Sequence, residues 1–466
     1  MKKLTLKSHL AIIVGKLIFL LTRVLKIGGG TAAPGLYALK IDGHLLEKFT
    51  AQLQKGSIVI TGTNGKTTTS RIISRYFSQS NIPTIHNRAG SNLERGLVST
   101  CLQQCSWLGN LENIHYGIWE MDEAEFARSI TKVNPKIIVM LNLFRDQLDR
   151  YGEVDTTRRK WESALKNISD SVTCVINNDD PQLVQLASQL NKESIIRYNL
   201  KGETPGVSNI FNPVGMVLCP NCHTRVTFQT QTISGQGIFT CSECGLSNNT
   251  SDVQLTIETS GAEQTSGSLR FNNQATPFGT SITGLYNLYN YIAAFSVINQ
   301  LTNDSGKFIE SARTISVAFG RMEKVTYQDK TLLICLIKNP TGATEIFKTV
   351  FHKALHERCG FLLNDNFADG KDVSWIWDIP IESLHVNPER VFVSGTRAYD
   401  MALRLQHSGI PENSITVDTD ITSFIESITN DAETGKIIPI FTTYTAMIEL
   451  QRFFGKTGVK KEYWEE

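Results

Sequence analysis

The stretch SIVITGTNGKTT at residues 57–68 decides the fold that this sequence predicts. It opens with β-branched residues typical of a buried strand, and residues 66–80 have helical spacing. Glycines between a strand and a helix let backbone N–H groups close on phosphate oxygens. The spacing, GxxGKT, is shorter than the standard GxxxxGKT pattern. A glycine turn that merely precedes a lysine is the alternative, but the flanking strand and helix favour nucleotide binding.

The polar residues of this loop have expected roles in binding ATP. The Lys66 ammonium would interact with the β- and γ-phosphates, and the Thr67 hydroxyl would ligate Mg²⁺. The predicted nucleotide contacts in the loop are Thr63, Asn64, Gly65, Lys66, Thr67 and Thr68.

Strands and helices alternate along the chain. Strand-like runs at residues 116–120, 136–141 and 172–176 are separated by helical stretches such as residues 156–168. This pattern predicts an α/β fold, with a mostly parallel sheet covered by helices on both faces and a second, smaller Rossmann-like α/β domain after it. The expected divisions are an N-terminal basic helical segment at 1–55, a central ATP-binding domain at 56–321 and a C-terminal domain at 322–466.

Four of the nine cysteines form two C-x-x-C pairs with 18 residues between them. The spacing is typical of a zinc ribbon with a closed, structural site. Two unrelated redox pairs are the alternative interpretation. Composition turns rich in Ser, Thr, Gly and Asn over residues 205–268, which we interpret as a small insertion, with the zinc ribbon at about 215–248. The predicted zinc ligands are Cys219, Cys222, Cys241 and Cys244.

Charge and hydropathy narrow the choice of partners. The net charge of +1 argues against a nucleic-acid groove. The first 40 residues hold seven Lys or Arg and no Asp or Glu, and the apolar run at residues 10–21 is too short to span a bilayer. A helix packed on the neighbouring domain is the first interpretation of this segment. Peripheral contact with an anionic membrane surface is the second.

Several segments, in order, resemble motifs of the Mur ligase family. The resemblance covers roughly residues 55–466 and implies ATP-dependent formation of a carbon–nitrogen bond. It implies that Glu120 binds Mg²⁺, that Asn287 faces adenine and that Arg321 helps to place the nucleotide. The segments are TGTNGKTT at 61–68, WEMDE at 119–123, LNLFRDQLDRYG at 141–152, NNDDP at 177–181, GLYNLYN at 284–290 and GRME at 320–323.

The cysteine insertion and the run at residues 364–378 resemble an amidating branch of that family. The resemblance implies a role in peptidoglycan biosynthesis and a cytoplasmic location, with the inner face of the membrane as a second interpretation. The resemblance implies conversion of the D-glutamate α-carboxylate of lipid II to D-isoglutamine through an acyl phosphate. It also implies a heterodimer, in which a GatD-type glutamine amidotransferase subunit supplies the ammonia.

The resemblance gives catalytic roles to Lys66, Glu120 and Asp369. Asp369 is expected to reach the partner glutaminase and orient its catalytic histidine, as the aspartate of a hydrolytic triad does. The alternative for Asp369 is a solvated turn. The alternative for Glu120 is a surface carboxylate in an acidic cluster, but its place at a strand end favours the functional interpretation.

Departures from the family pattern leave other functions open. Only about 55 residues precede the loop, too few for a UDP-sugar-binding domain. Gln147 replaces a histidine of the family motif, and Lys160 is out of register with a carbamylated lysine, so we give it no such role. An amino-acid-adding ligase of the MurE or folylpolyglutamate synthase type is one alternative. A non-catalytic ATP-binding scaffold, whose zinc ribbon docks a partner, is another.

Overall fold

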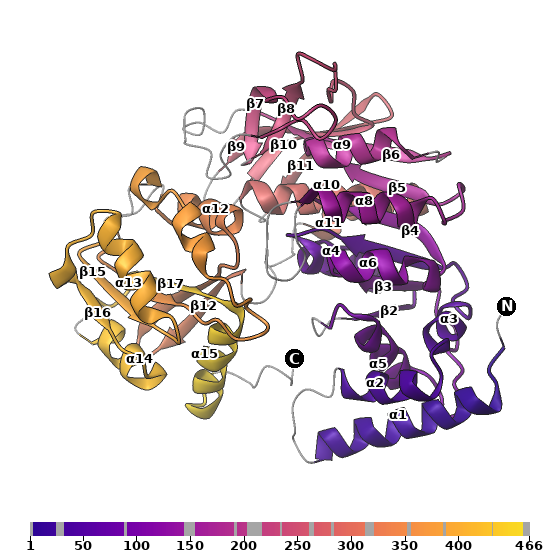
Figure 1. Cartoon of the computed structure of the whole chain (residues 1–466), viewed down its shortest axis with the longest axis horizontal. Helices are drawn as coiled ribbons and strands as arrows, with labels where there is room; N and C mark the ends of the chain where they lie inside the picture. The colour runs from indigo at the N-terminus through magenta and orange to yellow at the C-terminus, as the bar shows by residue number, and fades with distance from the viewer. Residues whose placement is uncertain are drawn as a thin grey trace.

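A computed structural model shows two α/β units joined in one chain (Figure 1). The structure describes residues 3–24, 32–87, 91–143, 154–190, 193–202, 217–233, 235–260, 265–280, 284–312, 321–351, 356–384, 388–430 and 432–459.

The larger unit is built on a nine-stranded sheet in the order β11-β10-β9-β6-β5-β4-β1-β3-β2. The strands from β2 to β9 in this order run parallel, whereas β9, β10 and β11 pair antiparallel at one edge. The predicted parallel sheet is therefore confirmed. The strands are β1 (Ser57–Thr61), β2 (Thr84–His86), β3 (Tyr116–Glu120), β4 (Pro135–Met140), β5 (Thr173–Asn177), β6 (Ile195–Lys201), β9 (Val253–Ser260), β10 (Thr265–Phe271) and β11 (Gln274–Thr280).

Helices cover both faces of this sheet because β1 is apolar on both sides. Ile58 and Ile60 join a core with α4, α10 and α11, while Val59 joins a second core with α5, α6, α8 and α9. Burial on both faces is usual for a parallel strand. The helices are α4 (Lys66–Gln79), α5 (Glu94–Gln104), α6 (Glu123–Ser129), α8 (Val154–Leu165), α9 (Pro181–Ser188), α10 (Leu285–Thr302) and α11 (Ser305–Ala312).

The N-terminal segment packs on this unit. Helices α1 (Leu6–Val24), α2 (Ala33–Ile41) and α3 (Leu45–Thr50) contact one another or α5, and their buried residues belong to the same core as Val59. Figure 1 shows α1 as the outermost helix along this edge of the molecule.

The zinc-ribbon insertion is shorter than residues 205–268, the segment rich in Ser, Thr, Gly and Asn. Strands β7 (Thr227–Ile233) and β8 (Gln236–Thr240) form a separate two-stranded sheet beside the four cysteines. The interpretation of all of residues 205–268 as an insertion is wrong, because β9 and β10 pair into the main sheet. Both strands alternate buried residues with partly exposed ones, and the partly exposed positions can be Ser or Thr.

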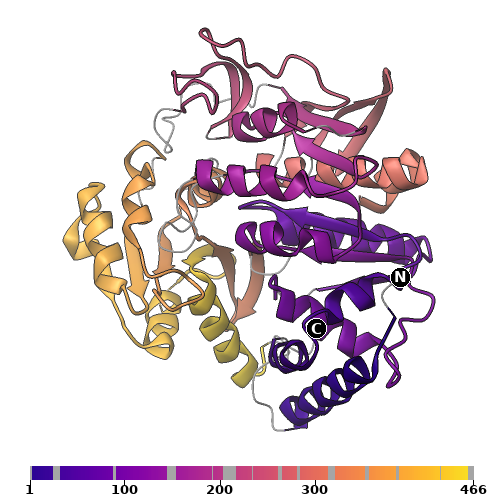
Figure 2. The same ribbon diagram turned by 45° about the vertical axis from the view of Figure 1, so that its right-hand side comes forward.

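The C-terminal unit is a six-stranded sheet in the order β12-β13-β17-β14-β15-β16, with only β12 antiparallel. Helices α12 and α13 cover one face, and α14 and α15 the other. In both views this unit lies beside the ends of the strands of the large sheet (Figures 1 and 2). Its elements are β12 (Arg321–Tyr327), β13 (Lys330–Leu336), α12 (Pro340–Phe351), β14 (Arg358–Leu362), β15 (Arg390–Ser394), α13 (Ala398–His407), β16 (Ile415–Val417), α14 (Ile421–Thr429), β17 (Ile437–Thr442) and α15 (Tyr444–Lys456).

Candidate active site

The loop between β1 and α4 has backbone conformations that only glycine adopts without strain. Gly62 has φ of +137° and Gly65 has φ of +94°. A Cβ added at Gly65 would lie 2.0 Å from Asn290 Oδ1 of α10. The loop therefore passes very close to α10, and its glycines are required by geometry as well as by flexibility.

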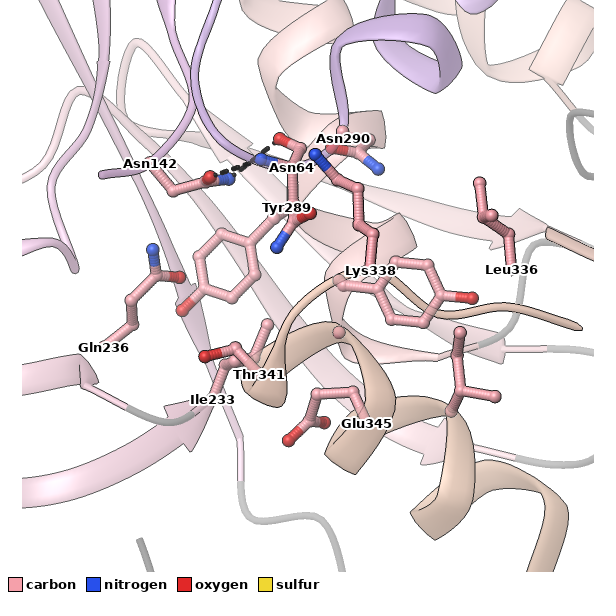
Figure 3. A pocket seen from close by; sticks show the side chains of 14 residues that line it. Asn64, Asn142, Ile233, Gln236, Tyr289, Asn290, Leu336, Lys338, Thr341 and Glu345 are labelled. Carbon is pink, nitrogen blue, oxygen red and sulfur yellow. Dashed lines mark hydrogen bonds between the residues drawn. The ribbon is translucent and has the colours of Figure 1, made fainter. Parts of the chain in front are cut away.

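Asn142, just beyond β4, holds the loop in this shape (Figure 3). Its side-chain carbonyl accepts a hydrogen bond from Asn64 N at 2.8 Å, and its amide donates to Asn64 O at 3.0 Å. Its backbone carbonyl accepts from Thr63 N at 3.1 Å. The Thr68 hydroxyl is buried in the first turn of α4 and has no hydrogen-bond partner among the described residues.

Lys66 is the first residue of α4, and its side chain curls back over the loop. Its ammonium donates to the carbonyls of Gly62 and Thr63 and lies 3.6 Å from Glu123 Oε2. Asp122 Oδ1 is 3.9 Å away. The lysine is buried, so the acidic pair beside it offsets the cost of removing its charge from water.

Glu120 ends β3 and is fully buried beside the start of α4. Its carboxylate accepts from the Thr67 hydroxyl at 2.8 Å and from the Ser70 hydroxyl at 2.6 Å, and His86 Nε2 lies 3.4 Å away. Burial alone would raise the pKa of Glu120, but His86, Ser70 and Thr67 together hold it below its ordinary value. The group is therefore an anionic oxygen ligand held in place by three neighbours.

This donor set suits a nucleotide with Mg²⁺. A carboxylate and a hydroxyl are the hard oxygen ligands that Mg²⁺ prefers, and the nearby lysine suits phosphate. Gly62 and Gly65 carry no side chains, which lets the backbone N–H groups of the loop close on phosphate oxygens. Lys66, Thr67 and Glu120, predicted separately, thus lie together. His86 was not predicted, although its place at the end of a strand in the same sheet was a usable signal.

A pocket lies where this loop faces the C-terminal unit (Figure 3). Lys338 donates to Thr63 O at 3.1 Å, and the side-chain amides of Asn64 and Asn339 exchange hydrogen bonds of 3.2 and 3.4 Å. The pocket is lined by Asn64, Gly65, Asn142, Ile233, Gln236, Tyr286, Tyr289, Asn290, Leu336, Lys338, Thr341, Gly342, Glu345 and Ile346.

Of the predicted nucleotide contacts, Asn64 and Gly65 line this pocket, whereas the other predicted loop residues lie beside it in the loop and the start of α4. Asn287 is buried in the first turn of α10, next to lining residues Tyr286 and Tyr289 but not among them. Arg321 begins β12, and its side chain lies outside the described residues, as does Gln147. Lys160 is exposed on α8.

The NNDDP turn connects the site to the rest of the large unit. Asp180 caps α9 by accepting from Gln182 N at 2.9 Å, and it also accepts from Leu143 N at 2.8 Å. Asp179 accepts from the Tyr289 hydroxyl at 2.7 Å and from Leu200 N at 2.9 Å. Burial raises the pKa of Asp179 to about 7 and that of Asp180 to about 6, despite these hydrogen bonds.

The four predicted cysteines meet at one point beside β7 and β8. Their sulfur atoms all lie within 4.8 Å of one another, as four ligands of one tetrahedral metal ion require. Each pair sits on a tight knuckle, with His223 N donating to Cys219 O and Gly245 N donating to Cys241 O. His223 is not part of the cluster, so four thiolates could complete the site without it.

Asp369 lies in the C-terminal unit, beside the start of α15. Both of its carboxylate oxygens accept from Thr445, one from the backbone N–H at 2.7 Å and one from the hydroxyl. Burial raises its pKa above the ordinary value, more than these hydrogen bonds lower it. The solvated-turn interpretation is therefore wrong for the carboxylate itself, which is buried at the start of α15.

Comparison with known proteins identifies the family. Residues 60–216 match the family model of the Mur ligase middle domain, and residues 336–447 match that of the MurT ligase C-terminal region. The MurT subunit of lipid II isoglutaminyl synthase (glutamine-hydrolyzing) from Streptococcus pneumoniae is 30% identical over 461 residues, which is 98% of this chain and 99% of that protein. The chain belongs to the MurT family of Mur ligases.

Other relatives agree with this membership. The MurT subunit from Staphylococcus aureus strain COL is 29% identical over 91% of this chain and 94% of its own. The structure of a pseudomurein peptide ligase type C from Methanothermus fervidus shares the fold, with a TM-score of 0.66 at 18% identity over 88% of this chain and 81% of that chain. The structure of MurF ligase from Thermotoga maritima in complex with ADP has a TM-score of 0.61 at 12% identity, and the match covers 90% of this chain and 84% of that chain. Mur ligases are ATP-dependent ligases, so the loop before α4 belongs to an enzyme of that class.

Proposed function

We propose that this chain is the synthetase subunit that amidates the D-glutamate α-carboxylate of lipid II to D-isoglutamine in peptidoglycan biosynthesis. The observation that carries the proposal is the relation to the pneumococcal MurT subunit along 98% of the chain. The arrangement of Lys66, Thr67 and Glu120 supports the ATP-dependent half of the reaction.

The reaction needs activation because a carboxylate is a poor electrophile. A carboxylate oxygen attacks the γ-phosphorus of ATP, the bond to ADP breaks, and an acyl phosphate forms. Ammonia then attacks the carbonyl carbon, and phosphate leaves with the former carboxylate oxygen. The ammonia nitrogen loses one proton to the leaving phosphate, to water or to a nearby base as the amide forms.

The loop residues supply positioning and charge for the first step. Lys66 would exchange its contacts to the Gly62 and Thr63 carbonyls for contacts to the β- and γ-phosphates. Thr67 and Glu120 would hold Mg²⁺, which neutralises charge that develops on the phosphates. Because Ser70 and His86 also contact the Glu120 carboxylate, it is preorganised for this role.

We place the nucleoside in the pocket beside Asn64 and Gly65. The pocket opens directly from the phosphate loop, and tyrosines of α10 offer aromatic surface for a base. Asn287 and Arg321 keep their proposed nucleotide contacts, Asn287 from the first turn of α10 and Arg321 from the start of β12.

We place a GatD-type glutaminase subunit on the C-terminal unit, close to Asp369. The names of the relatives, which are subunits of a glutamine-hydrolysing enzyme, support such a partner. Phe367 is 77% exposed and Tyr399 is 71% exposed, and their two segments are joined by an Asp365–Arg397 ion pair at 3.4 Å. Exposed aromatic residues are typical anchors of protein interfaces. Asp369 would orient the partner's catalytic histidine.

The four-cysteine cluster is proposed to hold a structural Zn²⁺. Four thiolates fill a tetrahedral site and leave no open position for a substrate. The ribbon then stabilises one side of the pocket, because Ile233 of β7 and Gln236 of β8 line it.

The test is to incubate the purified chain with ATP, Mg²⁺, lipid II and ammonium, and to analyse the stem peptide by mass spectrometry. Conversion of the glutamate carboxylate to a carboxamide is the expected result. Addition of a supplied amino acid instead would show an amino-acid-adding ligase. ATP binding without any product, even after a GatD-type glutaminase and glutamine are added, would show a scaffold.

A further inference from the structure

The outward face of α1 is apolar along its whole length, against the usual pattern of a surface helix. Leu6 is 88% exposed at one end and Val24 is 78% exposed at the other. Helical spacing places the seven exposed residues within about 100° of one another around the axis. We call these residues the outer stripe: Leu6, Leu10, Ile13, Leu17, Leu20, Leu21 and Val24.

The opposite face of α1 fixes its orientation. Ser8, Ala11, Ile12 and Gly15 are buried against α2 and α5. A Cβ at Gly15 would lie 2.6 Å from Leu102 Cδ1, so this helix approaches α5 closely. The outer stripe is therefore held away from the protein core by well-packed contacts on the other side.

Polar contacts lock the same orientation. The Ser8 hydroxyl donates to Asp42 Oδ2 at 2.7 Å, and Lys48 donates to the same oxygen at 2.7 Å. Lys16 donates to Cys105 O at 2.7 Å. Rotating the helix to hide the outer stripe would break the bonds that Ser8 and Lys16 make.

The charge around the outer stripe has one sign. Lys7 and Arg23 are exposed on α1 and flank the stripe on either side by helical spacing. Residues 1–41 contain seven Lys or Arg and no acidic residue, and the first acid, Asp42, is buried and paired with Lys48. Two copies of such a face would repel each other, whereas an anionic surface would attract it.

An exposed tryptophan extends the apolar surface. Trp107 is 53% exposed and lies beside α1, with the Lys16 ammonium 5.5 Å from its ring centroid. Leu108 is also exposed, and a Cβ on the next residue, Gly109, would meet Ile12 and Leu4 side chains. Tryptophan is enriched at membrane–water interfaces, where its ring is half in the apolar layer.

We propose that the outer stripe, with Trp107 and Leu108, docks in the surface of an anionic phospholipid bilayer. The helix would lie parallel to the membrane plane, with its leucines among the acyl chains and its lysines at the headgroups. No helix among the described residues is long and apolar enough to cross a membrane. The docking stands on α1 itself, and only its purpose, presenting the site to a lipid-linked substrate, rests on the proposed function.

The test is flotation of the full chain with vesicles of phosphatidylglycerol and phosphatidylcholine, compared with vesicles of phosphatidylcholine alone. The chain should float with the anionic vesicles and bind the neutral ones at least about tenfold more weakly. The variant Leu17→Glu/Leu21→Glu should lose at least about tenfold in binding to anionic vesicles. A matched control, Tyr399→Glu/Leu403→Glu, changes two exposed residues with the same spacing on α13 and should bind as the unchanged chain does.

Several results would overturn the docking. One is equal flotation of the unchanged chain and the α1 variant with anionic vesicles. Another is that the unchanged chain binds neutral vesicles as well as anionic ones. A third is that light scattering shows self-association that depends on the outer stripe, while the chain binds no vesicles. Melting temperature and ATP binding, which should not change in the α1 variant, exclude misfolding as the cause. Vesicle binding without amidation would contradict the proposed function and support the docking. Amidation without vesicle binding would support the proposed function and contradict the docking.

Discussion

A methyl group at residue 65 would place its carbon 2.0 Å from Asn290 Oδ1, and the backbone there already has φ of +94°. The sequence motif predicted the glycine, but it could not name Asn290, which comes from a helix far along the chain. The same holds for His86, which lies 3.4 Å from Glu120 because two strands are neighbours in the sheet. Local sequence patterns predict the loop, but the residues that contact it from distant parts of the chain become known only from the tertiary structure.

Glu120→Gln is predicted to lower kcat for ATP-dependent amidation by about 10²–10³-fold, as loss of one preorganised electrostatic group does in other enzymes. The amide keeps the size of the side chain but removes the charge that would hold Mg²⁺. The measurement is initial-rate release of ADP across Mg²⁺ concentrations. Glu125→Gln is the control, since Glu125 is also buried but bonds to Ser129. Equal activity of the two variants would contradict the role of Glu120.

At the scale of elements, the sequence predicted β3 at its observed bounds and α4 within one residue. It failed at β9 and β10, which were taken for part of an insertion. Buried parallel strands show continuous apolar runs, whereas β9 and β10 alternate buried and partly exposed residues and are rich in Ser and Thr. It predicted the cluster of four cysteines but not that the same ribbon lines the pocket through Ile233 and Gln236.

Cys219→Ser is predicted to abolish stoichiometric zinc and to raise the KM for ATP by several-fold. With only three thiolates the ribbon loses its closed site, and the pocket wall that β7 and β8 form loosens. Zinc per chain by elemental analysis and KM by coupled assay are the measurements. Cys105→Ser, at the cysteine that follows α5 and lies outside the cluster, should retain zinc. Full zinc content in Cys219→Ser would contradict the assignment.

Asp179 should make the free energy of unfolding fall as pH rises. Its folded pKa is about 7, against 3.8 ordinarily, so the folded state holds a proton that the unfolded state has lost. Stability is then lost between about pH 4 and pH 7, by about 1.4 kcal/mol for each pKa unit of difference. Urea unfolding at about pH 5 and pH 7.5 should show a smaller change in Asp179→Asn than in the unchanged chain. Asp304→Asn, at a surface position, should keep the original slope.

At the scale of the whole molecule, the C-terminal unit touches the phosphate loop through Lys338 and Asn339. It also carries Asp369, which is hydrogen-bonded to Thr445 at the start of α15, so one unit could serve both the ATP site and a partner. The sequence predicted a second α/β unit and its family. It could not show that α1 turns an apolar stripe outward, because both faces of that helix are apolar and only packing decides which is buried.

Asp369→Asn is predicted to lower glutamine hydrolysis by the complex with a GatD-type subunit about 10²-fold or more, as loss of an orienting aspartate does in a hydrolytic triad. Amidation driven by added ammonium should remain, because the proposed role of Asp369 is in the hydrolysis of glutamine and not in the use of ATP. Asp372→Asn, in the same loop, is the matched control. Unchanged glutaminase activity in the Asp369 variant would remove this residue from the mechanism.

The central claim is that the loop before α4 uses ATP to activate a carboxylate for amidation. The direct measurement supplies lipid II with ¹⁸O in the D-glutamate α-carboxylate, together with ATP, Mg²⁺ and ammonium, and follows the label by mass spectrometry. The account predicts that each amide formed is matched by one released phosphate that carries one ¹⁸O atom. Release of phosphate without ¹⁸O, or with the carboxylate left intact, would contradict it.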